Sequence, residues 1–206
     1  MEFKRCYYYS HNNTNDDDLF GELPDDQFID EAEADESLTK SDKEKSISLM
    51  RVNASGEVSA QALYRGQAFF SKTPEVKEHL IKAGDEEFAH LEWCTKRLEE
   101  LGGKKSLLDP FYYAGSFTLG SVAALIGDGT SLGFVEETEK QVVEHLKRHL
   151  NEMSPDDKKS REILEKMLEE EEIHGQEAKD HGSKDLPAPV KGIMTATSKI
   201  MTTLSR

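Results

Sequence analysis

Apolar residues recur at helical spacing in two long stretches of the chain, at about 46–72 and 74–101. The first stretch begins after a Ser-x-x-Glu capping pattern at 41–44 and stops before Pro74, and the second ends at Gly102-Gly103. These start and stop signals coincide with the ends of the apolar patterns. The first half of the chain therefore predicts two long helices.

The apolar stripe of the second helix also carries two polar residues, Glu87 and His90. The other members of the stripe are Leu80, Ala83, Leu91, Cys94, Leu98 and Leu101. A charged side chain that faces a core without a partner is strongly unfavourable. We therefore expect Glu87 and His90 to meet partners inside the fold.

The later part of the chain repeats this arrangement. Its apolar pattern predicts a helix over about 131–151, a turn and cap at 154–157, and a further helix that runs to about 181–182. The inward residues are Val135, Val142, Leu146, Leu150 and Met153 in the first of these helices, and Leu164, Met167, Leu168, Glu171, His174 and Ala178 in the second. The predicted fold class is all-α, with these four helices forming a bundle.

Two more helices are expected outside the four. Residues 107–135 are the least polar part of the chain and contain an uncharged run of 18 residues that begins at Pro110. Because Gly, Ser and Thr dilute its hydrophobicity, we expect an additional buried or interfacial helix between the second and third bundle helices, rather than a membrane span. After 186–189 comes a C-terminal amphipathic, locally basic helix, which fits equally well as a cap on the bundle or as a helix on a membrane surface.

Charge divides the chain into two predicted parts. Residues 1–45 hold 14 Asp or Glu against five Lys or Arg, with few aliphatic residues, which predicts a disordered or loosely attached acidic segment. The folded domain is then 46–206. The net charge of −15 and the lack of a Lys/Arg block argue against a nucleic-acid partner. With two cysteines, Cys6 and Cys94, and no visible secretory or transit pattern, we expect a reduced, cytosolic setting.

Two Glu-x-x-His motifs, Glu87-x-x-His90 and Glu171-x-x-His174, place a carboxylate and an imidazole on one helix face. An acid lies upstream of each motif at similar range: Glu57 is 30 residues before Glu87, and Glu139 is 32 residues before Glu171. At 100° per residue, Glu139 lies about 40° from the centre of its apolar stripe. Glu137 and Glu144 lie about 160–180° away, on the predicted solvent side, so Glu139 is the candidate.

Two inward glutamates plus one Glu-x-x-His from each of two further helices is the ligand set of ferritin-like di-iron carboxylate bundles. The predicted metal ligands are Glu57, Glu87, His90, Glu139, Glu171 and His174. Two divalent ions would neutralise four buried carboxylates, and mixed carboxylate and imidazole ligation favours iron or manganese over zinc. His145, six residues after Glu139, is a candidate hydrogen-bond partner behind the ligands, although a structural role accounts for it equally well.

Several longer motifs resemble the bacterial demethoxyubiquinone hydroxylases, over about residues 47–206. The matching segments are Arg51-Val52-Asn53-x-x-Gly56-Glu57-Val58-x-Ala60-Gln61-x-x-Tyr64-x-Gly66-Gln67, Glu87-x-x-His90-Leu91, Ser106-Leu107-Leu108-x-Pro110-x-x-Tyr113-Ala114-Gly115-Ser116-Phe117 and Leu132-Gly133-Phe134-Val135-x-x-Thr138-Glu139. The resemblance implies a ferritin-like di-iron monooxygenase that hydroxylates the ring of demethoxyubiquinol in the penultimate step of ubiquinone biosynthesis. It also implies that the six residues above are the ligands, with Glu87 and Glu171 bridging the ions.

The same resemblance implies two Fe ions per chain, O2 as co-substrate, and electrons from the quinol itself or from NADH. The implied location is the cytoplasmic face of the bacterial inner membrane, with peripheral attachment. The implied partners are a polyprenylated quinol, the membrane surface and other ubiquinone-biosynthesis proteins. On this interpretation the apolar 107–126 region and the last helix share one purpose, which is to dock on the bilayer and admit the ring.

One residue departs from the family pattern. Family members have His in an Asn-His-x-Gly-Glu run where this chain has Ala54, so we expect changed surroundings of the site rather than a lost site. Two rival functions use the same helices: a ferritin-like iron oxidase or peroxide scavenger, which needs no route for a lipid, and a lipid-binding helical scaffold without metal.

Overall fold

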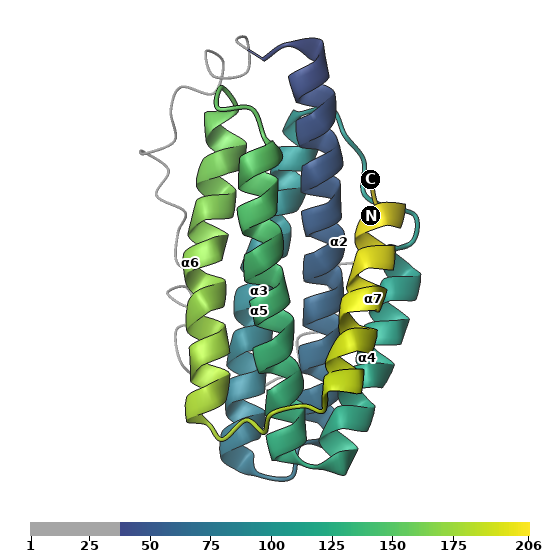
Figure 1. Cartoon of the computed structure of the whole chain (residues 1–206), viewed down its shortest axis with the longest axis vertical. Helices are drawn as coiled ribbons and strands as arrows, with labels where there is room; N and C mark the ends of the chain where they lie inside the picture. Colours follow the sequence, from purple (N-terminus) through teal and green to yellow (C-terminus); the bar gives the residue numbers. More distant parts are fainter. Residues whose placement is uncertain (1–37) are drawn as a thin grey trace, which may run out of the picture.

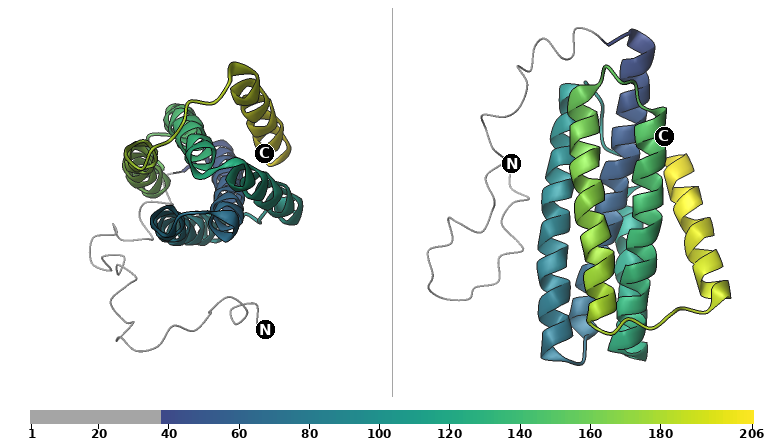
Figure 2. Two further views of the ribbon diagram at one scale, coloured as in Figure 1. Left: turned by 90° about the horizontal axis from the view of Figure 1, so that it is seen from below. Right: turned by 60° about the vertical axis from the view of Figure 1, so that its left-hand side comes forward.

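The computed structural model describes residues 38–206, and within this range the chain forms six α-helices. They are α2 (Lys40–Phe70), α3 (Pro74–Glu100), α4 (Asp109–Ile126), α5 (Asp128–Glu152), α6 (Lys158–Asp180) and α7 (Ala188–Leu204). Four of them, α2, α3, α5 and α6, run side by side along the long axis, and α4 and α7 lie outside these four (Figures 1 and 2). The all-α bundle with two additional helices is therefore confirmed.

The bundle interior holds two apolar clusters with a polar layer between them. One cluster includes Ala54, Cys94 and Met167, and the other includes Tyr64, Ala83 and Ala178. On every bundle helix the predicted ligands fall between residues of the two clusters in sequence. For α2 the order is Ala54, Glu57, Tyr64. The site is thus built into the middle of the bundle, with apolar packing above and below it.

Helix α2 begins earlier than the sequence predicted. Its N-cap is Thr39, whose hydroxyl accepts a hydrogen bond from the Asp42 amide at 3.1 Å, so the Ser-x-x-Glu pattern at 41–44 lies inside the first turn. Residues 40–45 of the predicted acidic segment are therefore helical. Residues 1–37 of that segment lie outside the described residues.

Helix α4 packs against α2 at very short range because both helices carry a glycine at the crossing. A Cβ at Gly66 would collide with the Phe117 carbonyl, and one at Gly120 would collide with the Leu63 carbonyl. The chain then turns at Gly127, whose φ of 154° favours glycine, and α5 starts at Asp128 rather than at the predicted 131. The 107–135 stretch is thus two helices broken at one glycine.

Helix α7 is reached through a short strap, residues 183–187, that lies flat against α5. A Cβ at Gly133 would collide with the Lys184 carbonyl, and the Lys184 amide donates to the Gly129 carbonyl at 2.8 Å. Lys191 at the start of α7 lies 3.5 Å from the carboxylate of Glu137. Glu137 is consequently only 7% exposed, which corrects the prediction that it faces solvent.

The large exposed apolar side chains concentrate on α4 and α7. Nine of the thirteen in the described residues lie there: Phe111, Leu119, Val122, Leu125 and Ile126 on α4, Ile193, Ile200 and Leu204 on α7, and Leu107 just before α4; the other four are Phe69, Ile81, Phe88 and Ile173. Helix α7 has no buried residue, although Ser205, which follows it, places its hydroxyl 3.3 Å from the Tyr112 hydroxyl of α4. Within residues 38–206, none of the helices has the length and hydropathy that a membrane span requires.

Candidate metal centre

All six predicted ligands lie in the interior, and each of the four bundle helices supplies at least one. The exposed fractions are 3% for Glu57, 0% for Glu87 and His90, 1% for Glu139 and Glu171, and 4% for His174. Four carboxylates in one interior layer repel one another and lose their hydration, so this arrangement requires compensating positive charge.

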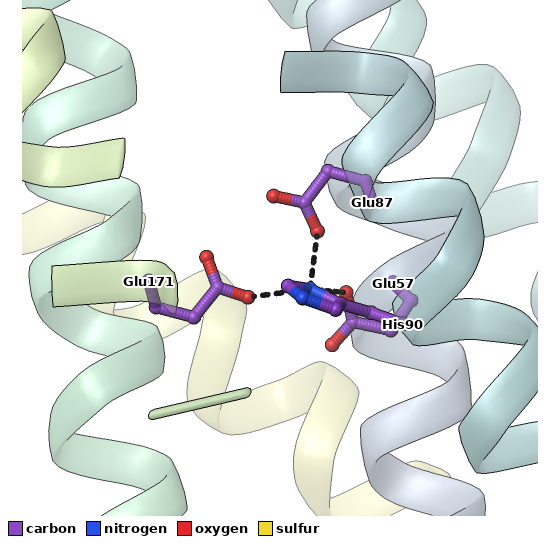
Figure 3. A group of neighbouring side chains, drawn as sticks. All are labelled: Glu57, Glu87, His90 and Glu171. Atoms are coloured by element: carbon purple, nitrogen blue, oxygen red, sulfur yellow. Dashed lines mark ion pairs between the residues drawn. The ribbon is translucent and has the colours of Figure 1, made fainter. Parts of the chain in front are cut away.

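Four of the six side chains converge on a single point (Figure 3). One atom each of Glu57, Glu87, His90 and Glu171 lies within 4.8 Å of the others. The Nδ1 atom of His90 lies 3.2 Å from Glu171 Oε1, 3.5 Å from Glu87 Oε2 and 3.9 Å from Glu57 Oε2. These distances leave room for one cation among four donor groups.

The second imidazole approaches the same two central carboxylates. His174 Nδ1 lies 3.3 Å from Glu87 Oε1 and 3.3 Å from Glu171 Oε2. The carboxylates of Glu87 and Glu171 therefore each face both imidazoles, which is the position that a bridging ligand occupies. Glu139 stands at the edge of this group, where the buried Tyr64 hydroxyl donates to its Oε1 at 2.8 Å.

Two further acids fix the imidazoles from outside, and sequence reasoning did not identify them. Glu170 Oε2 lies 2.7 Å from His90 Nε2, and Glu86 Oε2 lies 2.9 Å from His174 Nε2. A carboxylate in this place holds the proton on Nε2 and turns Nδ1 inward, as acids behind metal-bound histidines do. Glu170, which contacts His90, directly precedes Glu171, and Glu86, which contacts His174, directly precedes Glu87. This shared position before each motif is the sequence feature that could have identified the two acids.

Protons can compensate part of the negative charge in this layer. Burial and the neighbouring Glu87 and Glu171 raise the pKa of Glu57. Burial and the same two acids, Glu171 first, raise the pKa of Glu139. Burial disfavours the imidazolium form of His174, but the hydrogen bond to Glu171 and the nearby Glu87 carboxylate outweigh burial and raise its pKa to about 11.

The other central pair follows the same logic. Burial lowers the pKa of His90, but the hydrogen bond to Glu170 and the facing carboxylates of Glu171 and Glu87 more than offset it, so the pKa is raised. Burial would raise the pKa of Glu87, yet the two facing imidazoles lower it. The raised pKa values of Glu57, Glu139, His90 and His174 favour protons on these four groups, which a bound cation would replace.

The donor atoms fit hard divalent cations. Among the described residues, no hydrogen-bond partner reaches Glu57 Oε2, either oxygen of Glu87, Glu139 Oε2 or His90 Nδ1, although all are buried. The buried Cys94 thiol instead contacts the Met167 sulfur at 3.6 Å. Oxygen and imidazole donors without thiolate suit iron or manganese better than zinc.

Two residues singled out from the sequence, His145 and Ala54, make no described hydrogen bond to the six predicted ligands. His145 contacts the Arg148 guanidinium at 2.9 Å and packs on His149, and within residues 38–206 it makes no hydrogen bond to the six. Glu86 and Glu170, rather than His145, contact the imidazoles of His174 and His90. Ala54 is 1% exposed and belongs to an apolar cluster, so at this position the site is bordered by core packing.

The family described as "Ubiquinone biosynthesis protein COQ7" matches residues 44–205, which include all six predicted ligands and all of α3 to α7. The chain belongs to this family. Its COQ7 relatives include the 3-demethoxyubiquinol 3-hydroxylase of Francisella philomiragia, which is 53% identical over 171 residues, or 83% of this chain and 81% of that protein. The enzyme of the same name from Francisella tularensis subsp. novicida is 52% identical over the same shares.

A solved structure supports the ferritin-like fold of this COQ7 protein. The dodecameric thioferritin, a bacterioferritin-related protein from Bacteroides fragilis, superposes with a TM-score of 0.59. The match covers 73% of this chain and 89% of that chain at 18% identity. At this identity the likeness bears on the fold alone, and it confirms the ferritin-like bundle.

Proposed function

We propose that this COQ7 protein is a 3-demethoxyubiquinol 3-hydroxylase that acts with O2 in ubiquinone biosynthesis. The observation that carries the proposal is the 53% identity to an enzyme of that name over 171 residues, in a chain whose Glu and His motifs meet in the interior. Hydroxylation replaces one ring C–H bond by C–OH. One atom of O2 enters the product, the other leaves as water, and two electrons and two protons are consumed.

Two iron ions would be held by six side chains of this chain. Glu57, Glu87, His90 and Glu171 would hold one ion, and Glu87, Glu139, Glu171 and His174 the other, with Glu87 and Glu171 shared. A pair of ferrous ions supplies the electrons and the coordination that make O2 reactive toward an electron-rich ring. The electrons would be restored by the quinol itself or by a nicotinamide donor.

The protein residues orient the site and keep it dry. Glu86 and Glu170 hold the two imidazoles with Nδ1 turned inward. The apolar clusters on both sides of the polar layer exclude water along the bundle axis. A dry, preformed site strengthens the electrostatic interactions within it and limits side reactions.

The apolar faces of α4 and α7 suit a substrate that resides in the bilayer. A polyprenyl tail keeps the quinol in the membrane, so the enzyme must meet it at the lipid surface. Exposed side chains such as Phe111, Leu125 and Ile200 give these two helices an apolar face, and α7 carries Lys191 and Lys199 with no acid. We therefore place α4 and α7 against the cytoplasmic surface of the inner membrane, in a peripheral arrangement.

The test is complementation of a bacterial strain that accumulates demethoxyubiquinone. The wild-type chain should restore ubiquinone, His90→Ala should not, and His181→Ala, a histidine on the exposed end of α6, should restore it like wild type. Purified protein should contain two irons and convert demethoxyubiquinol. Turnover of Fe(II) and peroxide without conversion of the quinol would indicate an iron oxidase or peroxide scavenger. Less than one iron per chain, with no effect of Glu171→Ala, would indicate a lipid-binding scaffold.

A further inference from the structure

We infer that the two metal positions of the proposed centre are unequal, and that Tyr64 is a positioning residue for only one of them. The inference rests on the proposed di-iron function. The first position is Glu57, Glu87, His90 and Glu171. The second position is Glu87, Glu139, Glu171 and His174. The two share Glu87 and Glu171, so their difference must come from the remaining residues.

The four donors of the first position lie close together. One donor atom of each of its four residues already lies within 4.8 Å of the others. Within the described chain, its private donors Glu57 Oε2 and His90 Nδ1 have no hydrogen-bond partner. A cation that arrives there breaks no hydrogen bond to these two atoms. This position should bind first and hold its ion most tightly.

The second position depends on a carboxylate that another group already restrains. The Tyr64 hydroxyl donates to Glu139 Oε1 at 2.8 Å, while the buried Glu139 Oε2 has no described partner. Tyr64 is itself 0% exposed, so no water competes for the phenol. The hydrogen bond therefore presents Glu139 to an ion through one oxygen and sets the direction of that oxygen.

The phenol comes from α2, the helix that also supplies Glu57 seven residues earlier. It reaches Glu139 of α5 across the bundle, so the restraint on Glu139 comes from a different helix. No equivalent donor reaches Glu57, whose Oε2 is unpartnered among residues 38–206. The two similar halves of the sequence thus give two metal positions that differ in one hydrogen bond: Glu139 accepts one from Tyr64, and Glu57 has no such donor.

The second position also has a cavity beside it. A cavity of about 340 Å³ runs between α5 and α6 and is lined by Glu171, Gly175, Lys179 and Asp185, among others. Gly175 lines this cavity, and a Cβ at Gly175 would stand 3.5 Å from the Glu139 Cβ. Gly175 therefore packs between the cavity and Glu139. Helices α5 and α6 supply Glu139 and His174, which belong to the second position alone. Its ion should therefore exchange first.

Removing the phenol should affect one position selectively. In Tyr64→Phe, Glu139 loses the hydrogen bond that fixes its direction while its shape and neighbours are kept. Partners of this kind behind a metal ligand are worth roughly 10–100-fold in metal affinity. We expect the weaker of two Co²⁺ binding steps to lose affinity by about 10–100-fold, with the tighter step changed by less than about threefold.

The experiment titrates the metal-free full-length chain with Co²⁺ and follows heat and visible absorption. Wild type should show two distinct steps, and excess chelator should release the two ions in a fast and a slow phase. Tyr64→Phe should weaken the second step and accelerate the fast phase alone. The matched control is Tyr113→Phe, because the Tyr113 phenol contacts Arg65 at 3.4 Å and not a predicted ligand. It should behave as wild type.

Several results would overturn the inference while leaving the proposed function intact. These are a single unresolved binding step for two ions, equal weakening of both steps by Tyr64→Phe, no weakening at all, or the same effect from Tyr113→Phe. Fewer than two Co²⁺ per wild-type chain at saturation would contradict the inference and the proposed centre together. Iron-loaded wild type that binds two ions but fails to hydroxylate the quinol would contradict the proposed function alone.

Discussion

Two clusters of buried charge join α3 to α6, and they differ in what neutralises the acids. In the candidate metal centre, the facing carboxylates raise the pKa values of His90 and His174, so protons on these imidazoles can supply positive charge. Near the end of α3, Arg97 is 1% exposed and its guanidinium lies 2.9 Å from Asp157, which is also buried. The same guanidinium donates to the Ser160 hydroxyl at 2.8 Å.

The difference decides which cluster can accept a metal ion. An arginine keeps its proton at every pH at which proteins fold, so the acid beside Arg97 is neutralised permanently. Imidazolium and carboxyl protons can leave, so the acids of the metal centre can exchange protons for a divalent cation. Burial of an acid is therefore a poor guide to a metal site, and the nature of its counter-charge is a better one.

The largest expected effect is the loss of metal binding and hydroxylation when a central carboxylate of the candidate metal centre is removed. Glu171→Ala removes a carboxylate that faces both imidazoles, so we expect binding of two ions and all hydroxylation to be lost. Iron analysis and product formation measure this. The control is Glu172→Ala, because the Glu172 side chain is 54% exposed and pairs with Lys147. Full activity in Glu171→Ala would show that Glu171 is not a required metal ligand.

The next effect concerns stability rather than metal. Arg97→Met leaves the buried Asp157 without its cation, and breaking such a pair costs about 3–5 kcal/mol of unfolding free energy. Urea unfolding at neutral pH measures this loss. The double variant Arg97→Met with Asp157→Asn should recover part of it, because the uncompensated charge is gone. The folded Arg97→Met protein should still bind two ions, and loss of metal without loss of stability would contradict the distinction.

The third prediction uses acid to sharpen the contrast. Metal ions must displace the protons of His90 and His174, whose pKa values are raised, and those of Glu57 and Glu139, whose pKa values are also raised. Each proton displaced strengthens metal binding about tenfold, or about 1.4 kcal/mol, per unit rise in pH. Titration in weakly buffered solution should detect proton release, two from the imidazoles and up to two from the carboxyls. Release of no protons would mean that the metal-free acids are neutralised in another way.

The sequence predicted most of this site because its signals are local. Glu87 and His90 share a helix face with apolar residues, and the angular position of Glu139 on its stripe favoured it over Glu137 as a candidate ligand. Helix α3 has nearly the predicted bounds because Pro74 and Gly102 mark them. A helix face is determined by spacing along the chain, so it can be read without knowledge of the neighbouring helices.

The features that were missed depend on segments far apart in sequence. Glu137 lies on the outer face of α5 as predicted, but it is buried because Lys191 of α7 covers it. Glu86 and Glu170 lie beside the inward stripes, and each reaches an imidazole of the opposite helix. Thr39, rather than Ser41, caps α2. The capping patterns Thr39-x-x-Asp42 and Ser41-x-x-Glu44 overlap, so spacing along the chain could not decide between them. In each case a tertiary contact or a competing local signal decided the outcome.

The smallest expected effect comes from a buried polar residue that carries no charge in the folded state. His149 is 0% exposed and its Nδ1 lies 2.9 Å from Asn53 Oδ1. Burial, followed by the nearby His145, Arg206 and Arg148, lowers the pKa of His149 to about 2. The folded protein therefore keeps His149 neutral at pH 5, while the unfolded chain protonates it below about pH 6.5.

This difference fixes the sign of the pH effect. The unfolded state binds more protons, so stability falls on acidification, by about 2 kcal/mol between pH 7 and pH 5 for this one residue. His149→Gln keeps a donor for Asn53 and removes the titration, so its stability should fall correspondingly less over the same range. Urea unfolding of both metal-free proteins at the two pH values measures the difference, and the ligand histidines contribute equally to both. Parallel pH profiles would mean that His149 binds its proton equally well in the folded and unfolded states, which would contradict the lowered pKa of His149.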